Sequence, residues 1–79
     1  MSFKFTEKQG QYLAFIHLYT KLNRIPPAEA DIQKYFRVAP PTVHQMIKNL
    51  DEKGLITRIP GQPRTIQVLV PPEKLPELR

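Results

Sequence analysis

The stretch of residues 39–54, APPTVHQMIKNLDEKG, carries two prolines near its start and a glycine at its end. Pro40 and Pro41 suit a first helical turn, whose N–H groups lack intrahelical partners. Gly54 suits the left-handed residue that often follows a helix. The apolar residues between these signals recur at helical spacing: Val43, Met46, Ile47 and Leu50. The stretch therefore predicts a helix over residues 40–53 with one apolar face directed into a core.

The opposite face of this predicted helix is polar, and it holds no acidic residue before Asp51. Its members are donors and acceptors that reach base edges and phosphates: Thr42, His44, Gln45, Lys48 and Asn49. We interpret residues 40–53 as a recognition helix. The stretch alone leaves open the alternative of a buried amphipathic helix with a solvated polar face.

The length of 79 residues allows one domain, and the 41% of hydrophobic residues suffices for a compact core. Cysteine is absent, so disulfides and thiolate metal sites cannot supplement that core. No apolar run is long enough for a membrane span, and the N-terminus lacks the apolar region of a signal peptide. We expect a soluble cytoplasmic protein with no membrane partner.

The net charge of +5 and the pI near 9.8 favour a polyanionic partner, although a basic surface can also serve solubility alone. The excess of positive charge lies in residues 1–27 and in residues 55–70. The second of these segments contains Arg58 and Arg64 and no acid.

Two further helices are predicted before residue 40. Thr6 and Gln9 fit a capping box, and an apolar stripe runs from Tyr12 to Leu22, after which Asn23 can close the helix in the left-handed conformation. Leu18 lies outside the stripe and is expected to be exposed. Pro26 ends the helical pattern because the residue before a proline favours extended geometry.

Helical spacing resumes over residues 28–36, with Ile32, Tyr35 and Phe36 on the apolar face. Residues 37–39 then join this helix to the helix of residues 40–53. Two helices joined by such a short turn form a helix-turn-helix.

After Gly54 the pattern changes to β-branched residues in alternation, which predicts strands over residues 55–59 and 64–70. Ile66, Val68 and Val70 share one face, and residues 60–63, PGQP, form the connecting turn. A hairpin after a helix-turn-helix is a wing. The fold class is therefore mainly α with a small β-hairpin, a winged helix-turn-helix of three helices and a two-stranded antiparallel wing over residues 1–70. The proline-rich tail, residues 71–79, is expected to be extended or polyproline II and to pack Leu75 and Leu78 on the body.

In order and spacing, the chain resembles the N-terminal DNA-binding domain of LexA-type repressors over residues 5–69. The segments that carry the resemblance are FTEKQ at 5–9, IPP at 25–27, residues 28–36, PTVH at 41–44, LDEKGLI at 50–56 and PRTIQVL at 63–69. The resemblance implies a winged helix-turn-helix in which Thr42, His44 and Gln45 face the bases, Lys48 lies nearer the backbone and Arg64 lies on the wing.

Three departures limit what the resemblance implies. The family continues into a self-cleaving, dimerising domain with a Ser–Lys pair, for which this sequence has no residues, so a short stand-alone protein is expected. Ala39 replaces the family's polar N-cap, and Pro41 stands where the family often reads a base. Any operator should therefore differ from the family's.

The candidate DNA-binding residues are Thr42, His44, Gln45, Lys48, Arg58, Gln62 and Arg64. Gln45 suits adenine, His44 suits guanine and the Thr42 methyl group suits thymine, while Lys48, Arg58 and Arg64 suit phosphates. Alternatives remain open: a solvated imidazole for His44, service to the first helical turn for Thr42, and the minor groove for Arg64.

Catalysis and metal binding find no support in the sequence. The single serine is Ser2, and His17 and His44 lie on different predicted helices without further ligands. We expect no enzyme activity, no metal, no cofactor and no small-molecule substrate.

Two functional hypotheses follow. The first is a sequence-specific double-stranded DNA-binding protein, a transcriptional regulator such as a repressor, with helix 40–53 in the major groove and wing 59–64 on the flanking backbone. It would gain from a homodimer or a protein partner, with Leu18 or the Leu75/Leu78 tail as the interface. The alternative is a winged-helix protein-interaction module without specific DNA binding.

Overall fold

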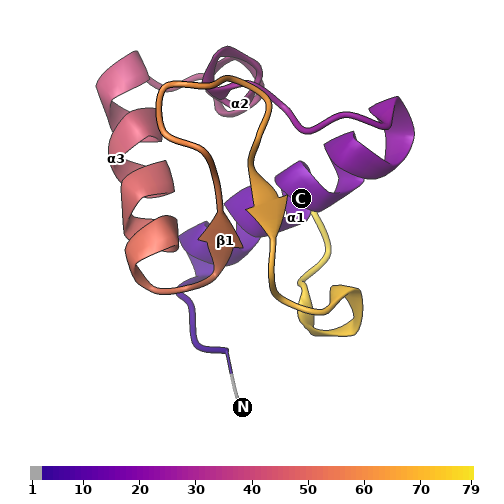
Figure 1. Cartoon of the computed structure of the whole chain (residues 1–79). Helices are drawn as coiled ribbons and strands as arrows, with labels where there is room; N and C mark the ends of the chain where they lie inside the picture. The colour runs from indigo at the N-terminus through magenta and orange to yellow at the C-terminus, as the bar shows by residue number, and fades with distance from the viewer. Residues whose placement is uncertain (1–2) are drawn as a thin grey trace.

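A computed structural model of the chain describes residues 3–79, so residues 1 and 2 of the predicted domain lie outside the described part. The elements, in order, are α1 (Glu7–Asn23), α2 (Glu29–Phe36), α3 (Pro40–Glu52), β1 (Ile56–Thr57), β2 (Gln67–Val68) and a 3-10 turn, η1 (Pro72–Lys74). α1 lies across the back of the molecule, with α2 at one end, α3 along one side and the hairpin in front (Figure 1). The fold class predicted from the sequence, a winged helix-turn-helix, is confirmed.

α1 begins with the predicted capping box. The Gln9 N–H donates to Thr6 Oγ1 at 3.1 Å, and the Thr6 N–H donates to Gln9 Oε1 at 2.9 Å. The prediction for the end of α1 is wrong by one residue, because Arg24 and not Asn23 takes the left-handed conformation (φ 59°). Asn23 stays helical and its Nδ2 donates to the Tyr19 carbonyl at 3.0 Å, capping the last turn from within.

The apolar stripe of α1 ends earlier than predicted. Its inner face buries Tyr12, Leu13, Phe15 and Ile16, but Leu22 is 80% exposed. The last turn of α1 extends past the elements that cover its middle, so Leu22 has no core to enter (Figure 1). Leu18 is exposed, as expected. No helix among residues 3–79 has both the length and the apolar character needed to cross a membrane.

α2 and α3 are joined by residues 37–39, with Arg37 left-handed (φ 56°) at the end of α2. Tyr35, predicted in the core, is 43% exposed and lies at its rim. Its ring stacks on Phe15 at a centroid distance of 4.5 Å, while Phe36 stacks on Tyr12 at 4.2 Å. The aromatic residues of α1 and α2 therefore pack against each other, with Tyr35 exposed and Tyr19 and Phe36 half-buried.

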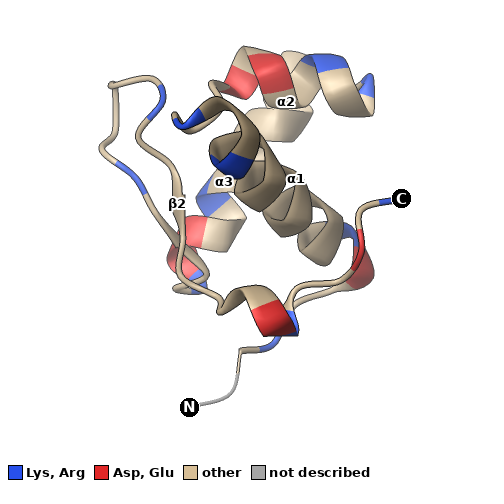
Figure 2. Cartoon of the chain, turned by 90° about the vertical axis from the view of Figure 1, so that its right-hand side faces the viewer, with Lys and Arg blue, Asp and Glu red and all other residues tan. Residues whose placement is uncertain are grey.

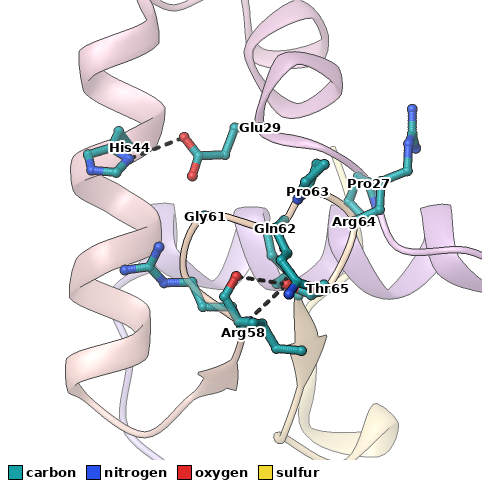
Figure 3. Close-up of a pocket in the computed structure, with 11 residues that line it drawn as sticks. Pro27, Glu29, His44, Arg58, Gly61, Gln62, Pro63, Arg64 and Thr65 are labelled. Atoms are coloured by element: carbon teal, nitrogen blue, oxygen red, sulfur yellow. Dashed lines mark hydrogen bonds and ion pairs between the residues drawn. The ribbon is translucent and has the colours of Figure 1, made fainter.

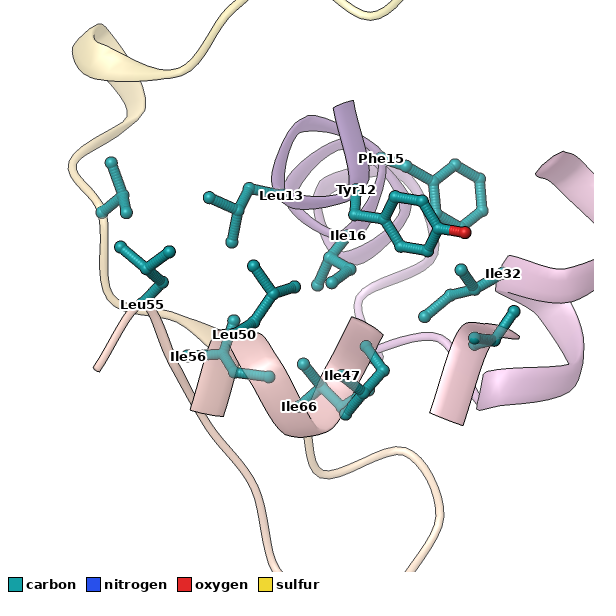
Figure 4. Close-up of a cluster of buried hydrophobic side chains, with 12 residues drawn as sticks. Tyr12, Leu13, Phe15, Ile16, Ile32, Ile47, Leu50, Leu55, Ile56 and Ile66 are labelled. Atoms are coloured by element: carbon teal, nitrogen blue, oxygen red, sulfur yellow. The ribbon is translucent and has the colours of Figure 1, made fainter. Parts of the chain in front are cut away.

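The core lies between α1, α3 and the hairpin (Figure 4). α3 inserts Val43, Ile47 and Leu50, each at most 1% exposed. Burying side chains of this size contributes about 1.5–3 kcal/mol each. Met46, predicted in the same stripe, is only half-buried at its edge. α3 therefore has one fixed inner face, and its opposite face is left to solvent.

The hairpin is shorter than predicted. Ile56 pairs with Val68 and Thr57 with Gln67, so each strand has two residues and not the expected five to seven. The ladder stops there because Pro60 and Pro63 have no N–H and the Ile59 N–H donates to the Thr65 hydroxyl at 2.9 Å. The predicted inward face is confirmed, since Ile66 and Val70 are buried.

The tail packs along α1 and is not a free extended segment. It contains the 3-10 turn η1, which departs from the predicted extended or polyproline II form. Gln11 binds it at two points: Nε2 donates to the Glu77 carbonyl and Oε1 accepts from the Arg79 N–H, both at 2.9 Å. A Cβ at Gly10 would lie 3.0 Å from Pro76 Cγ, so glycine permits this close approach. Leu75 and Leu78 pack on the core, as expected.

Gly54→Ala tests the predicted left-handed end of α3. Gly54 has φ +73°, and nothing in the described part of the chain lies within 4 Å of the position that an alanine methyl group would take. The cost is therefore conformational, and the free energy of unfolding should fall by about 1 kcal/mol in urea titrations. Gly54→Asn is the control and should lose less, because asparagine tolerates this conformation. Equal stability of Gly54→Ala and wild type would contradict the assignment.

Candidate nucleic-acid interface

The outer face of α3 presents the side chains that the sequence placed there. Thr42, His44, Gln45 and Lys48 are all exposed. Ala39 gives the helix no side-chain cap, and the first turn of α3 holds no acidic residue. The positive end of the helix dipole is therefore not neutralised by a carboxylate of its own first turn. We call the side chains of Thr42, His44, Gln45 and Lys48 the α3 face.

Asn49 shares the α3 face with Gln45. Gln45 Nε2 donates to Asn49 Oδ1 at 2.9 Å, across one helical turn. The bond orders the Gln45 amide parallel to the helix, and a base edge would have to replace it. Asn49 belonged to the polar face of the sequence but not to the candidate site, although its position four residues after Gln45 is the signal for such a pair.

An apolar element also lies on this side of α3. A shallow hollow is lined by Pro41, Thr42, Gln45, Met46 and Asn49. Pro41 and the half-buried Met46 give it apolar walls among hydrogen-bonding groups. Such a surface can accept a methyl group as well as polar edges.

His44 is paired with α2, which the sequence did not indicate. Its Nδ1 lies 3.4 Å from Glu29 Oε1, and both side chains remain accessible (Figure 3). In a neutral ring, a proton on Nδ1 shared with Glu29 leaves Nε2 as an acceptor, whereas a protonated ring presents a donor there. The guanine contact expected for His44 needs a donor at Nε2. The Glu29 contact at Nδ1 therefore influences which base His44 can bind.

The wing tip is a tight turn closed by one side chain. The Gln62 N–H donates to the Ile59 carbonyl at 3.1 Å, with Pro60 and Gly61 (φ +80°) at the centre of the turn. The Thr65 hydroxyl accepts from the Ile59 N–H and donates to the Gln62 carbonyl at 3.0 Å. Gln62 is exposed at the tip, as its place among the candidates requires.

A groove separates the wing from the helix-turn-helix, with a volume of about 330 Å³ (Figure 3). His44 and Glu29 stand on one side of it, and Gly61 and Gln62 stand on the other. The wing therefore flanks the α3 face and is not folded away from it.

Both candidate arginines lie close to carboxylates, although residues 55–70 contain no acid of their own. Arg58 Nε lies 3.2 Å from Asp51 Oδ2, and the Arg58 side chain is only 18% exposed. Arg64 Nη1 lies 3.2 Å from Asp31 Oδ2. The acids come from α3 and α2, so the sequence of the hairpin could not reveal them.

Arg64 makes two further contacts through the same nitrogen: Nη1 donates to the Tyr19 hydroxyl at 3.2 Å and to the Pro26 carbonyl at 3.3 Å. The hydrogen bond with Tyr19, ahead of the charge of Asp31, raises the pKa of the Arg64 guanidinium. Arg64 is thus engaged with the body of the domain.

Charge is unevenly spread over the molecule. In α2, acidic residues occupy the first turn and Lys34 the last, and two arginines mark the wing (Figure 2). Among residues 3–79, no three His, Cys, Asp or Glu side chains come together as metal ligands would.

Three helices, a short turn between the second and third, an antiparallel wing and an exposed polar face on the third helix define the chain as a winged helix-turn-helix domain. A family model described as LexA DNA binding domain matches residues 2–65. The chain belongs to the LexA DNA binding domain family.

Individual relatives agree with this assignment. The LexA repressor of Thermosipho melanesiensis is 39% identical over 66 residues, which are 84% of this chain and 33% of that protein. The LexA repressor of Thermosipho africanus is 37% identical over 68 residues, or 86% of this chain and 34% of that protein. The chain spans about a third of the length of these relatives.

Thr65→Val tests the closure of the wing tip. Losing the hydroxyl frees the Ile59 N–H and the Gln62 carbonyl, at a cost of about 1 kcal/mol. We expect the Ile59 amide to exchange with solvent faster in NMR hydrogen exchange, while amides of the α3 interior keep their protection. Thr65→Ser retains the hydroxyl and should exchange as wild type does. An Ile59 amide that keeps its protection in Thr65→Val would show that the hydroxyl does not close the tip.

Proposed function

We propose that this domain is a sequence-specific double-stranded DNA-binding module of a transcriptional regulator, with α3 in the major groove and the wing on the flanking backbone. One observation carries the proposal: the inner face of α3 is fully buried, while its outer face exposes Thr42, His44, Gln45 and Lys48 beside the wing. The major groove admits a helix, and each base pair presents a distinct pattern there. Membership of the LexA DNA binding domain family supports the same function.

The base contacts divide by chemistry. Gln45 suits an adenine edge once its bond to Asn49 is exchanged for two bonds to the base. The Thr42 methyl group, with the apolar walls of Pro41 and Met46, suits a thymine methyl. A well-made contact of this kind contributes about 1–3 kcal/mol of discrimination.

The candidate contacts to the DNA backbone differ in whether a carboxylate of the domain already pairs with their charge. Lys48 is exposed and makes no ion pair among those of residues 3–79, so its charge is available to a phosphate. Gln62 at the tip offers an amide to the flanking backbone. Arg58 and Arg64 add positive potential near the wing, but both are held by carboxylates.

A single module of this kind buries only about 600–1,000 Å² of protein surface on DNA, which is a small interface for tight specific binding. We propose a second copy or a protein partner, with half-sites of a symmetric dimer about 34 Å apart. Leu18 is the more accessible of the interface positions expected from the sequence, because Leu75 and Leu78 already pack on the core. The relatives named LexA repressor support a role in repression.

A protein-interaction module is the second candidate, and the exposed Leu22 and Ile25 after the middle of α1 favour it. Fluorescence anisotropy with a random-sequence duplex at two salt concentrations separates the two candidates. The DNA-binding proposal expects binding at low salt that weakens as salt rises. A duplex that stays unbound at low salt would leave the interaction module as the better account.

Gln45→Ala should flatten sequence preference. The variant loses the adenine contact, so selection from random duplex pools should yield a consensus with one degraded position per half-site and a loss of discrimination there of about 1–3 kcal/mol. Gln67→Ala removes an equally exposed amide from β2 and should leave the consensus intact. An unchanged consensus for Gln45→Ala would remove Gln45 from the base-reading set.

Lys48→Ala should weaken all duplexes alike. The lost phosphate contact should lower the slope of log affinity against log salt by about one. Lys74→Ala carries the same charge change to η1 and serves as the control. Equal slopes for Lys48→Ala and wild type would place Lys48 away from the backbone.

A further inference from the structure

We propose that Arg64 is a positioning residue that latches the wing to the helical body, and that it is not itself a DNA contact. Three acceptors from separate segments surround one nitrogen of its guanidinium. Tyr19 belongs to α1, Pro26 to the connector between α1 and α2, and Asp31 to α2. Arg64 therefore joins the wing, just after its tip, to both helices that precede α3.

The backbone of Arg64 turns its side chain toward that site. Its φ of 60° is left-handed, as at Arg24 and Arg37, a conformation that costs free energy in a residue other than glycine. In Figure 3 the guanidinium points away from His44 and from the wing tip at Gly61. A phosphate contact at the tip would require Arg64 to leave its three acceptors.

The tip of the wing is its least buried part. The ladder has two residue pairs, and residues 59–63 are all exposed. Ile66 and Val70 anchor the returning strand, but both follow Arg64 in the chain. Two ion pairs flank the exposed tip: Arg58 with Asp51 of α3 before it, and Arg64 with Asp31 of α2 after it. Arg64 is thus the contact that holds the returning side of the tip to α1 and α2.

Asp31 separates this proposal from a role in DNA contact. If Arg64 binds phosphate, removing Asp31 frees a cation and should strengthen DNA binding. If Arg64 is a latch, removing Asp31 loosens the wing and cancels part of the gain from losing a negative charge. Asp31→Asn keeps an oxygen for the Ala28 N–H, which Asp31 Oδ2 accepts at 2.9 Å, so the start of α2 is preserved.

The test uses Arg64→Asn, Asp31→Asn, the double variant and Glu73→Gln. Asparagine tolerates the left-handed conformation, so Arg64→Asn removes the guanidinium without imposing strain. Glu73→Gln, on η1, matches the charge change of Asp31→Asn away from the wing. Amide signals of buried α1 and α3 residues check that each variant is folded.

The first readout needs no DNA. The Gln62 amide should be at least several-fold less protected from hydrogen exchange in Arg64→Asn and Asp31→Asn than in Glu73→Gln. Nitrogen relaxation at Gly61 should show greater motion of the wing tip in the same two variants. The double variant should add little beyond Arg64→Asn, because Asp31 has no partner on the wing once the guanidinium is removed. Unchanged protection in Arg64→Asn would overturn the latch.

The second readout rests on the proposed function and uses anisotropy with a fixed duplex. Arg64→Asn should lower affinity several-fold at an unchanged salt slope, and Asp31→Asn should bind no more tightly than Glu73→Gln. A slope that falls by about one in Arg64→Asn, or tighter binding by Asp31→Asn than by Glu73→Gln, would identify Arg64 as a phosphate contact. Failure of wild type to bind any duplex would refute the proposed function, while the first readout would still decide the latch.

Discussion

The burial of the inner stripe of α3 is the constraint on which the rest of the structure depends. Val43, Ile47 and Leu50 are almost completely buried, so α3 cannot turn about its axis without exposing them. Close packing of protein interiors makes such a rotation costly. The residues outside this stripe are thereby fixed outward, and Thr42, His44, Gln45 and Lys48 owe their exposure to the burial of the stripe.

α1 is the platform against which this burial occurs, and its polar residues tie the other elements to it. Lys53, at the end of α3, donates to Gln9 Oε1 at 3.0 Å, the same oxygen that caps the start of α1. Gln11 holds the tail through both ends of its amide. The Tyr19 hydroxyl accepts from Arg64 Nη1, next to the wing tip. Three polar residues of α1 therefore bind the end of α3, the tail and the wing.

The predictions from the sequence succeeded where the physical cause is local. The capping box needs only Thr6 and Gln9, and the left-handed end of α3 needs only Gly54 after a helical pattern. The outward direction of Gln45 follows from the apolar period around it. Leu22 was misplaced because a period cannot tell where the neighbouring elements end.

The pairs that shape the candidate interface depend on the angle between helices, which no local pattern contains. Asp31 reaches Arg64, Glu29 reaches His44 and Asp51 reaches Arg58 only after α2, α3 and the hairpin have packed. The short ladder had a local signal in Pro60 and Pro63, but the Thr65 hydroxyl that replaces it did not. The sequence thus predicted which residues are exposed as candidates, and packing decided which of them are paired with a carboxylate.

The most direct test of the outward α3 face is an NMR titration of the nitrogen-labelled domain with a duplex recovered by selection from random pools. The account predicts that the largest amide shifts fall on α3 from Thr42 to Lys48 and on the wing tip at Gly61 and Gln62. It also predicts that Leu18, Leu22 and the tail around Leu75 stay nearly unshifted by the DNA itself. Shifts concentrated on the exposed end of α1, with the α3 face unchanged, would contradict it.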